Sequence, residues 1–191
     1  ETVHDSAFWS GCGPKLVVSK CRFNTYKKRR TICRAPAKPM IEFQNTLIII
    51  PARMASTRLP GKPMADILGL PMIVHVWKRA MESGVGKVLV AAAESVVAEA
   101  IRKQGGDAIV TDANLPSGSD RIAAALKLRD VSRSIEYIVN LQGDLPTIDP
   151  LAVQRCLAGL TNQGVDISTI AARIADDADV GLDVLADRRG V

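Results

Sequence analysis

Three cationic side chains, Arg53, Arg58 and Lys62, fall within one short stretch of this chain. The stretch, residues 51–62, also holds two prolines and a glycine, which interrupt regular structure, so we expect the cations to lie on a loop. The apolar run 47–50 (LIII) directly precedes it and is typical of a buried strand. Loops that leave buried parallel strands bind ligands in α/β proteins, and clustered Arg and Lys favour a polyanion such as a nucleoside triphosphate. A solvated basic surface loop is the alternative interpretation.

A carboxylate follows a second candidate strand. Asp144 ends the run Gln142-Gly143-Asp144, which comes directly after the apolar segment 137–141 (YIVNL). Gly143 would let the backbone approach a ligand closely, and the Asp144 carboxylate offers a hard oxygen ligand. Beside a triphosphate, Mg²⁺ is usually held by only one or two carboxylates, with phosphate oxygens and water in the remaining positions. Asp144 is therefore a candidate metal ligand, and an ordinary turn acid is the alternative.

A third candidate is the turn 117–121 (SGSDR), which leads into a predicted helix. Helix N-termini bind anions through their free N–H groups, but a simple capped helix start explains this pattern equally well. His75 lies in an apolar helical pattern and is interpreted as a packed core histidine, and His4 as an exposed one. Gly61-Lys62 is followed by proline, so the chain lacks a P-loop motif, which excludes a P-loop nucleotidase or kinase. We find no Ser/His/Asp or Cys/His arrangement for nucleophilic catalysis.

The elements that would position these residues alternate regularly from residue 46 onward. We expect strands at 46–50, 87–92, 108–111, 137–141 and 166–172, and helices at 71–83, 94–104, 119–128 and 150–160. Strand–helix alternation with short connections predicts right-handed crossovers and an α/β fold, a three-layer α/β/α sandwich of Rossmann-like type. The roughly 146 residues of this part are enough to bury one core. We expect no transmembrane segment.

Charge divides the chain into two parts, which we interpret as two regions, 1–45 and 46–191. Residues 1–45 carry nine Lys or Arg against three acids, a net charge of +6, whereas residues 46–191 carry sixteen against seventeen, a net charge of −1. The second region therefore lacks the basic excess of a nucleic-acid-binding domain, and we expect no nucleic-acid partner. The first region has no periodic apolar pattern, and we expect a disordered or non-native extension that contributes nothing to the folded core.

The cysteines indicate the compartment. Three of the four, Cys12, Cys21 and Cys33, lie in the first region with spacings that fit no metal or redox motif. Cys156 lies in a predicted helix and is interpreted as a buried thiol in a reducing compartment. The chain shows no long apolar core of a secretory signal. We therefore expect a cytoplasmic location and no association with a membrane.

The combined motifs resemble a known family. Residues 49–76 (IIPARMASTRLPGKPMADILGLPMIVHV), 117–122 (SGSDRI) and 138–148 (IVNLQGDLPTI) are similar to 3-deoxy-D-manno-octulosonate cytidylyltransferases, the CMP-KDO synthetases of lipopolysaccharide biosynthesis. The resemblance covers roughly residues 47–174 and implies a nucleotide-diphospho-sugar transferase fold. Because it covers only the N-terminal part of the family domain, we expect a C-terminally truncated domain. It also departs from the family at 90–93 (VAAA), where the family commonly reads V-A-T-D.

The resemblance implies cytidylyl transfer from CTP to KDO, with CMP-KDO and pyrophosphate as products, Mg²⁺ as the cofactor and a homodimer for the full-length family. It assigns catalytic roles to Arg53, Lys62 and Asp144, with Asp144 as the metal ligand. The residues that it places against the nucleotide are Ala52, Arg53, Arg58, Lys62, Ser117, Arg121 and Gln142. Two alternatives stay open: a fragment or paralogue that binds nucleotide without catalytic turnover, and a nucleotidyltransferase for another sugar.

Overall fold

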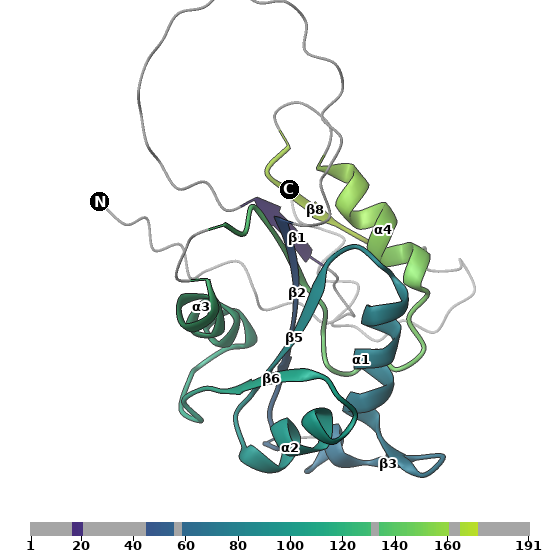
Figure 1. Ribbon diagram of the computed structural model, residues 1–191, viewed down its shortest axis with the longest axis vertical. Helices are drawn as coiled ribbons and strands as arrows, with labels where there is room; N and C mark the ends of the chain where they lie inside the picture. Colours follow the sequence, from purple (N-terminus) through teal and green to yellow (C-terminus); the bar gives the residue numbers. More distant parts are fainter. Residues whose placement is uncertain (1–16, 21–44, 56–58, 131–133, 161–164, 172–191) are drawn as a thin grey trace, which may run out of the picture. The chain divides into compact units, whose positions relative to one another are not determined.

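A six-stranded β-sheet with helices on both faces forms the centre of the computed structural model (Figure 1). The structure describes residues 17–20, 45–55, 59–130, 134–160 and 165–171. The strands follow the order β6-β5-β2-β7-β1-β8 across the sheet. Their bounds are β1 Val17–Lys20, β2 Thr46–Ala52, β5 Lys87–Ala92, β6 Asp107–Val110, β7 Tyr137–Asn140 and β8 Ile167–Thr169. The helices are α1 Met72–Glu82, α2 Ser95–Lys103, α3 Gly118–Arg129 and α4 Pro150–Gly159.

Four neighbouring strands of this sheet run parallel. β2 pairs with β5 on one side and with β7 on the other, and β5 pairs with β6. Ile49 lies at the centre of this arrangement, opposite Leu89 of β5 and Asn140 of β7. Strands that are buried on both faces read as continuous apolar runs, which is why the sequence of β2 shows no polar alternation. The parallel sheet confirms the predicted α/β class.

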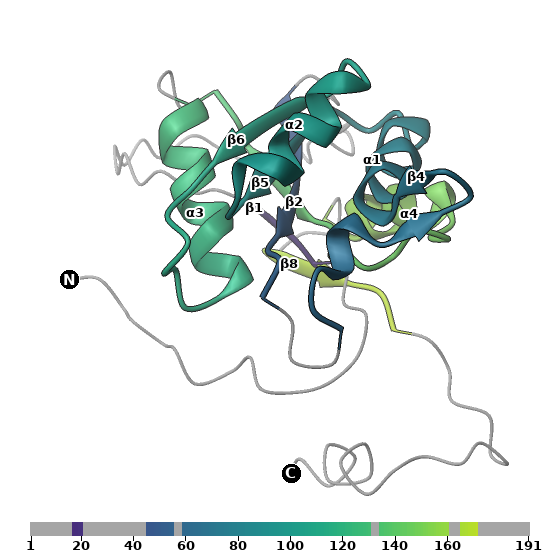
Figure 2. The ribbon, with the colours of Figure 1, turned by 90° about the horizontal axis from the view of Figure 1, so that it is seen from below.

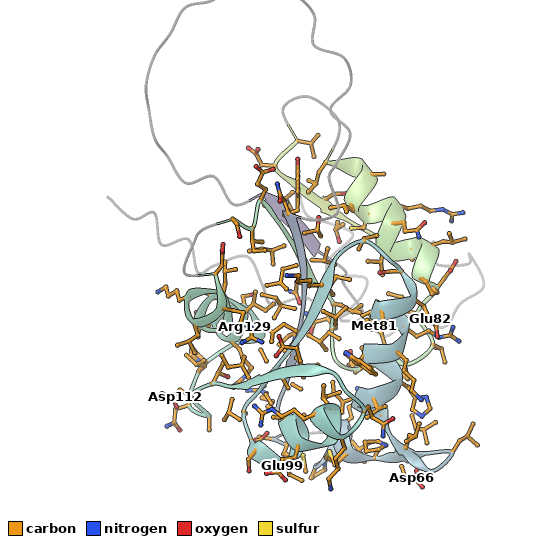
Figure 3. The ribbon with its side chains drawn as sticks, in the orientation of Figure 1. Asp66, Met81, Glu82, Glu99, Asp112 and Arg129 are labelled. Carbon is orange, nitrogen blue, oxygen red and sulfur yellow. The ribbon has the colours of Figure 1, made fainter. Side chains whose placement is uncertain are left out.

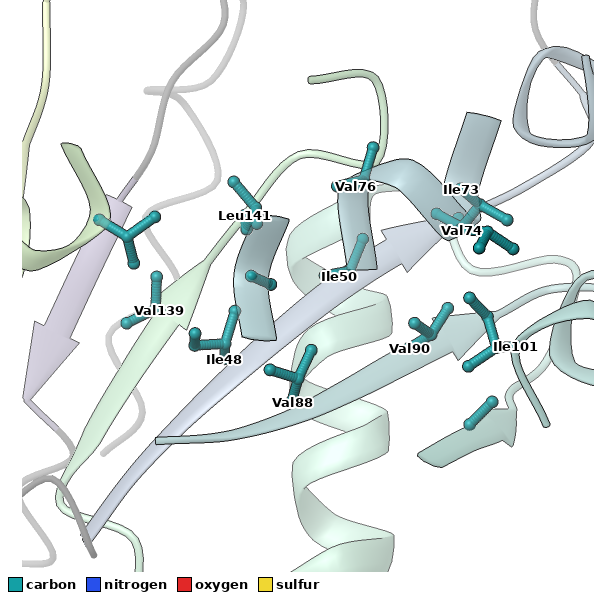
Figure 4. Close-up of a cluster of buried hydrophobic side chains, with 14 of the residues drawn as sticks. Ile48, Ile50, Ile73, Val74, Val76, Val88, Val90, Ile101, Val139 and Leu141 are labelled. Carbon is teal, nitrogen blue, oxygen red and sulfur yellow. The ribbon is translucent and has the colours of Figure 1, made fainter. Parts of the chain in front are cut away.

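The two faces of β2 are covered by different helices. Ile48 and Ile50 belong to a cluster that includes buried residues of α1, α2 and α4 (Figure 4). Leu47 and Ile49 belong to a second cluster, into which α3 inserts Ile122. Figure 2 shows α3 on the opposite side of the sheet from α1 and α4. Because successive strand residues point to opposite faces, one apolar run supplies both cores and produces the predicted three layers.

Most of the predicted elements of the second region are confirmed to within three residues at each end. The sequence did not reveal the short β3–β4 hairpin, Asp66–Ile67 and Leu70–Pro71, because each of its strands has only two residues. His75 lies in α1, as predicted, and is partly buried. Its Nε2 lies 2.8 Å from the carbonyl oxygen of Ile67, which can only accept a hydrogen bond, so this nitrogen donates and ties the hairpin to α1.

The strand β1 corrects one expectation about the first region. Val17–Lys20 pairs antiparallel with β7, with Val17 opposite Asn140, and antiparallel with β8, with Val17 opposite Thr169. These four residues therefore contribute to the sheet, although we expected nothing in residues 1–45 to do so. A four-residue strand is too short for a periodic pattern to stand out, and only its partners stabilise it. The other residues of 1–44 lie outside the described part of the chain, and their assignment stays a prediction.

All the elements named here belong to one compact unit, Lys15–Ile170. Among the described residues, the helices are all too short, or too polar, to cross a lipid bilayer. The longest of them, α3, has 12 residues, whereas a spanning helix needs about 20 apolar residues.

The turn of the β3–β4 hairpin holds a strained residue. Leu68 and Gly69 are the two residues between the paired strands, and both have positive φ, 52° and 83°. Such two-residue turns favour Asn-Gly, because Asn tolerates the left-handed conformation that costs Leu about 1–2 kcal/mol. The Leu68 side chain is 96% exposed and recovers nothing by packing.

We therefore expect Leu68→Asn to raise the free energy of unfolding by about 1 kcal/mol, which corresponds to a rise in Tm of about 2–4 °C. Thermal unfolding followed by circular dichroism measures it. Leu68→Ala is the matched control, since it removes the exposed apolar surface but keeps a side chain that disfavours positive φ. An equal gain in both variants would show that surface polarity, and not backbone strain, is the cause.

Candidate functional site

The parallel strands bring four connecting segments to one edge of the sheet. The carboxyl ends of β2, β5, β6 and β7 point the same way, because these strands are paired in parallel. The segments that follow them contain every candidate site residue of the described chain except Ala52, which is the last residue of β2. This edge is where open α/β sheets bind their ligands, so the geometry agrees with the candidate list.

The segment that follows β2, residues 53–62, carries the three cations and is called the basic loop here; a backbone hydrogen bond joins its two ends. The Gly61 N–H donates to the Met54 carbonyl oxygen at 3.0 Å, and the short 3₁₀ helix η2 begins directly afterwards with Lys62 (Lys62–Met64). Arg53 lies at the start of the loop and is exposed. Arg58 lies outside the described residues, so its predicted role stays a prediction. The chain thus returns at Gly61 to Met54, two residues after β2 ends, which keeps Arg53 and Lys62 near the same edge of the sheet.

Lys62 and Asp144 form an ion pair across this edge. The Lys62 Nζ lies 2.8 Å from Oδ2 of Asp144, although the two residues are 82 positions apart. Their side chains are 34% and 48% exposed. Half-exposed pairs contribute only about 0–1 kcal/mol to stability, so this pair is not needed to hold the fold. The structure therefore places together the two residues that the sequence named as triphosphate ligand and metal ligand.

Gly143 permits the close approach that brings Asp144 to β2. A Cβ at this position would lie 2.8 Å from the carbonyl oxygen of Pro51 and 3.3 Å from Cδ1 of Ile73. Backbone cannot yield at such a distance without moving the turn, so a side chain here would displace Asp144. On another side of Pro51, a Cβ on Gly118 would meet its ring at 3.5 Å, so the start of α3 also lies against the end of β2.

Arg121 is a buried cation. Its residue exposure is 2%, and its Nη1 donates to Oγ1 of Thr111 at 2.5 Å and to the carbonyl oxygen of Asp112 at 3.0 Å. Figure 3 shows Asp112 in the segment between β6 and α3. Burial lowers the pKa of Arg121, the Glu94 carboxylate acts in the opposite direction, and the neighbouring Arg53 lowers it further. Arg121 takes part in none of the ion pairs between described residues.

A buried guanidinium whose hydrogen-bond partners are neutral oxygens is costly, because desolvation favours the uncharged form. The cost falls when an anion or a hydrogen-bond acceptor of a ligand approaches. Arg121 lies on the first turn of α3, whose N–H groups add a partial positive charge at the same place. Contact of Arg121 with a nucleotide stays a prediction.

The hydroxyl of Ser117 caps α3. It accepts a hydrogen bond from the Asp120 N–H at 3.1 Å and donates to Asp120 Oδ2 at 2.6 Å. This is the capped helix start that the sequence allowed, and the exposed side chain has its bonding capacity largely committed. Contact of Ser117 with a nucleotide stays a prediction.

The two remaining candidates are held by strand ends. The Gln142 Nε2 donates to Oδ1 of Asn140 at 3.2 Å, which orients the Gln142 amide beside the end of β7. Ala52 is buried, and its carbonyl oxygen accepts from the Ala93 N–H at 2.9 Å, which joins the ends of β2 and β5. The structure thus brings Ala52, Lys62, Arg121, Gln142 and Asp144 to the same edge of the sheet.

Sequence reasoning missed Glu94. Both of its carboxylate oxygens accept from the Met54 N–H, at 3.0 and 3.2 Å, which links the segment after β5 to the basic loop. We named no site after β5, because Ala92 and Ala93 stand where the family has Thr and Asp. The sequence feature that could have revealed it is Glu94 itself, which follows Ala93 directly and is the first charged residue after that strand.

Together these residues can bind phosphate oxygens and a divalent cation at adjacent points. Arg53, Lys62 and Arg121 supply positive charge, and Asp144 supplies a carboxylate beside Lys62. Within the described part of the chain, no three His, Cys, Asp or Glu side chains gather into a metal cluster. A cation at Asp144 would therefore need oxygen ligands from a bound phosphate, which is how Mg²⁺ commonly accompanies nucleotides.

Known cytidylyltransferases are similar to this chain over most of its second region. A 3-deoxy-manno-octulosonate cytidylyltransferase of Parvibaculum lavamentivorans is 58% identical over 128 residues, 67% of this chain and 50% of the relative. A protein of the same description from Rhodospirillum rubrum is 51% identical over 137 residues, 71% of this chain and 54% of the relative. The chain thus spans about half the length of the curated relatives it matches.

Solved structures show the same fold. The CMP:2-keto-3-deoxy-manno-octonic acid synthetase complexed with CTP is 42% identical, with a TM-score of 0.56 over 60% of this chain and 46% of that one. A cytidylyltransferase from Leptospira borgpetersenii is 30% identical, with a TM-score of 0.52 over 63% of this chain and 51% of that one. Residues 47–180 match the family described as cytidylyltransferase. Because that match covers well over half of the residues, the chain belongs to the cytidylyltransferase family.

Proposed function

We propose that this chain provides the CTP-binding part of an enzyme that transfers a cytidylyl group from CTP to KDO and releases pyrophosphate. The observation that carries the proposal is the Lys62–Asp144 pair at the ligand-binding edge of the sheet. A lysine suited to phosphate and a carboxylate suited to Mg²⁺ lie 2.8 Å apart, in a chain 58% identical to a 3-deoxy-manno-octulosonate cytidylyltransferase. The CTP bound in the related synthetase supports the choice of nucleotide.

The reaction asks the protein for position and charge more than for covalent chemistry. The anomeric hydroxyl of KDO would attack the α-phosphorus of CTP, and pyrophosphate would leave. Arg53 and Lys62, together with Arg58 from the same loop, would hold the triphosphate and stabilise the charge that develops on it. Fixed cations do this without reorganisation, and the hydrogen bond from Gly61 to Met54 keeps Arg53 and Lys62 near each other.

Asp144 is the described residue that fits a Mg²⁺ ligand. Its carboxylate is half exposed and faces Lys62, so a cation there would lie directly beside the proposed triphosphate site. Bound Mg²⁺ would neutralise phosphate charge and make pyrophosphate a better leaving group. Lys62, released from Asp144, would then be free to contact a phosphate oxygen.

The nucleoside would lie toward α3 and the end of β7. Arg121 has guanidinium N–H groups beyond the Nη1 contacts with Thr111 and Asp112, and these could donate to acceptors of the base or the sugar. Ser117, Gln142 and the backbone at Ala52 are the further proposed contacts. By the same resemblance, we propose a cytoplasmic enzyme of lipopolysaccharide biosynthesis that works as a homodimer.

A second candidate function is nucleotide binding without turnover. It is favoured by one observation: Lys62 and Asp144 suit phosphate and a cation, whereas transfer also requires a site that holds the acceptor sugar. A nucleotidyltransferase for a different sugar is the third possibility, because the described site argues for the nucleotide and not for the acceptor.

The two main candidates differ in one assay. CTP binding is measured by calorimetry in the presence of Mg²⁺, and pyrophosphate release is then measured with and without KDO. KDO-dependent release at an ordinary enzyme rate, on the order of 1 s⁻¹ or more, is the result expected for the transferase. Binding of CTP with no KDO-dependent release identifies the second candidate. No binding of CTP contradicts both.

We expect Lys62→Ala to weaken CTP–Mg²⁺ binding or transfer by on the order of 10²-fold, because it removes a donor to the triphosphate. The Tm should change little, since the half-exposed pair with Asp144 contributes little to stability. Lys78→Ala is the matched control: it removes the same charge from the exposed side of α1. Equal CTP affinity in both variants would remove Lys62 from the nucleotide site.

We expect Asp144→Asn to abolish the Mg²⁺ dependence of CTP binding and of transfer, because a neutral amide is a poorer ligand for a hard divalent cation. Calorimetric titration with CTP at increasing Mg²⁺ concentrations measures it. Asp66→Asn, a change of the same kind at the exposed Asp66 of β3, is the control (Figure 3). A normal Mg²⁺ dependence in Asp144→Asn would contradict the assignment.

A further inference from the structure

Glu94 occupies the N-cap position of α2 but does not cap it. Its backbone is extended, with φ −121° and ψ 146°, and its side chain makes no hydrogen bond to its own helix. Side chains at this position normally accept from the second or third N–H of the helix, and Glu is a poor residue for that purpose. A local role in starting α2 therefore does not explain the residue.

The carboxylate instead reaches a segment 40 residues away. Both oxygens accept from the Met54 N–H, at 3.0 and 3.2 Å. The Met54 carbonyl oxygen accepts from Gly61 on its other side, at 3.0 Å. Met54 is therefore held through both of its backbone polar groups, at the point where the basic loop leaves β2. One of these two bonds closes the loop on itself, and the other, from Glu94, attaches it to the sheet.

The charge of Glu94 makes its position unusual. Its carboxylate accepts from the backbone N–H of Met54, the residue next to Arg53, and it raises the pKa of Arg121, so it lies near two cations of the site. A negative charge there repels a polyanion and lowers its affinity. The hydrogen bonds that the carboxylate accepts from Met54 are the favourable interaction that offsets this loss of affinity. A carboxylate that accepts from a backbone N–H makes a charge-assisted bond, stronger than a bond between neutral groups.

We infer that Glu94 is a positioning residue, which anchors the start of the basic loop through Met54 and so fixes Arg53 and Lys62 for the triphosphate. The inference rests on the proposed function, since it presumes that the loop binds phosphate. Its prediction for nucleotide affinity is the opposite of what removal of a nearby negative charge alone would cause. Removal of the anion alone should tighten nucleotide binding, whereas removal of the anchor should weaken it.

Three substitutions separate anchor from charge. Glu94→Gln keeps the reach and an acceptor oxygen but loses the charge. Glu94→Asp keeps the charge but is one methylene too short to reach Met54, and Glu94→Ala loses both features. Glu99→Ala is the control, because it removes the same charge from the exposed side of α2 (Figure 3). All variants are made in the 191-residue chain, and a melting curve of each shows that it is folded.

The first measurement needs no nucleotide. Hydrogen–deuterium exchange at the Met54 amide should accelerate about tenfold or more in Glu94→Asp and Glu94→Ala, because a hydrogen bond to a charged group is lost. It should stay within about threefold of the wild-type rate in Glu94→Gln, where the amide oxygen can replace the carboxylate, and should not change in Glu99→Ala. Unchanged exchange of the Met54 amide in Glu94→Asp would overturn the anchoring role. A wild-type exchange rate in Glu94→Gln would distinguish this role from general destabilisation of the fold.

The second measurement is CTP affinity in the presence of Mg²⁺. We expect Glu94→Asp and Glu94→Ala to bind CTP about tenfold more weakly, and Glu94→Gln to bind it equally or more tightly. Tightening in both Glu94→Ala and Glu94→Gln would show that Glu94 acts only as a charge, which overturns the inference. If Lys62→Ala weakens binding and Glu94→Asp does not, the positioning role is wrong and the proposed function stands. If the wild-type chain does not bind CTP, or if Lys62→Ala binds it as tightly as the wild type, the proposed function fails. The exchange rate of the Met54 amide still tests the anchoring role in that case.

Discussion

Parallel pairing of β2 with β5 on one side and β7 on the other determines where Lys62, Glu94 and Asp144 can lie. It sends the ends of three strands to one edge, so that residues forty or more positions apart in sequence meet there. The Ala52–Ala93 hydrogen bond and the close contact of Gly143 with Pro51 fix the distances at that edge. Without this register, the Lys62–Asp144 pair and the contact of Glu94 with Met54 could not form, since each joins two different strand ends.

The apolar core supports this register and carries no chemistry itself. All residues of β2 except Pro51 are fully or almost fully buried, so a shift of the strand by one residue would exchange its two faces. That constraint protects the polar edge, because the charged residues Arg53, Lys62 and Asp144 all follow the buried strands. Arg121 is the exception: it is buried, and the energetic penalty of its charge is reduced only by neutral oxygens and by more distant carboxylates.

The sequence predicted the features that depend on local patterns. Apolar runs and helical spacing located β2, β5, α1 and α2, and the strand–loop context of Lys62 and Asp144 identified both before any contact was known. Features that depend on distant partners were not predictable. β1 is a strand only because β7 and β8 flank it, and the two-residue strands of the β3–β4 hairpin show no period. Glu94 reads as an ordinary helix-start residue until the three-dimensional structure shows which N–H its oxygens accept.

The position of β1 has a consequence for the order in which the sheet assembles. β1 precedes all the parallel strands in the chain, yet it lies between β7 and β8, the last two strands of the unit. Contacts between residues so far apart in sequence close long loops. The entropic cost of closing such a loop comes before the contacts can stabilise it. The parallel strands β2, β5 and β6 need only shorter closures between consecutive elements. We therefore expect these three strands to associate early in folding, and the side of the sheet formed by β1 and β8 to assemble last.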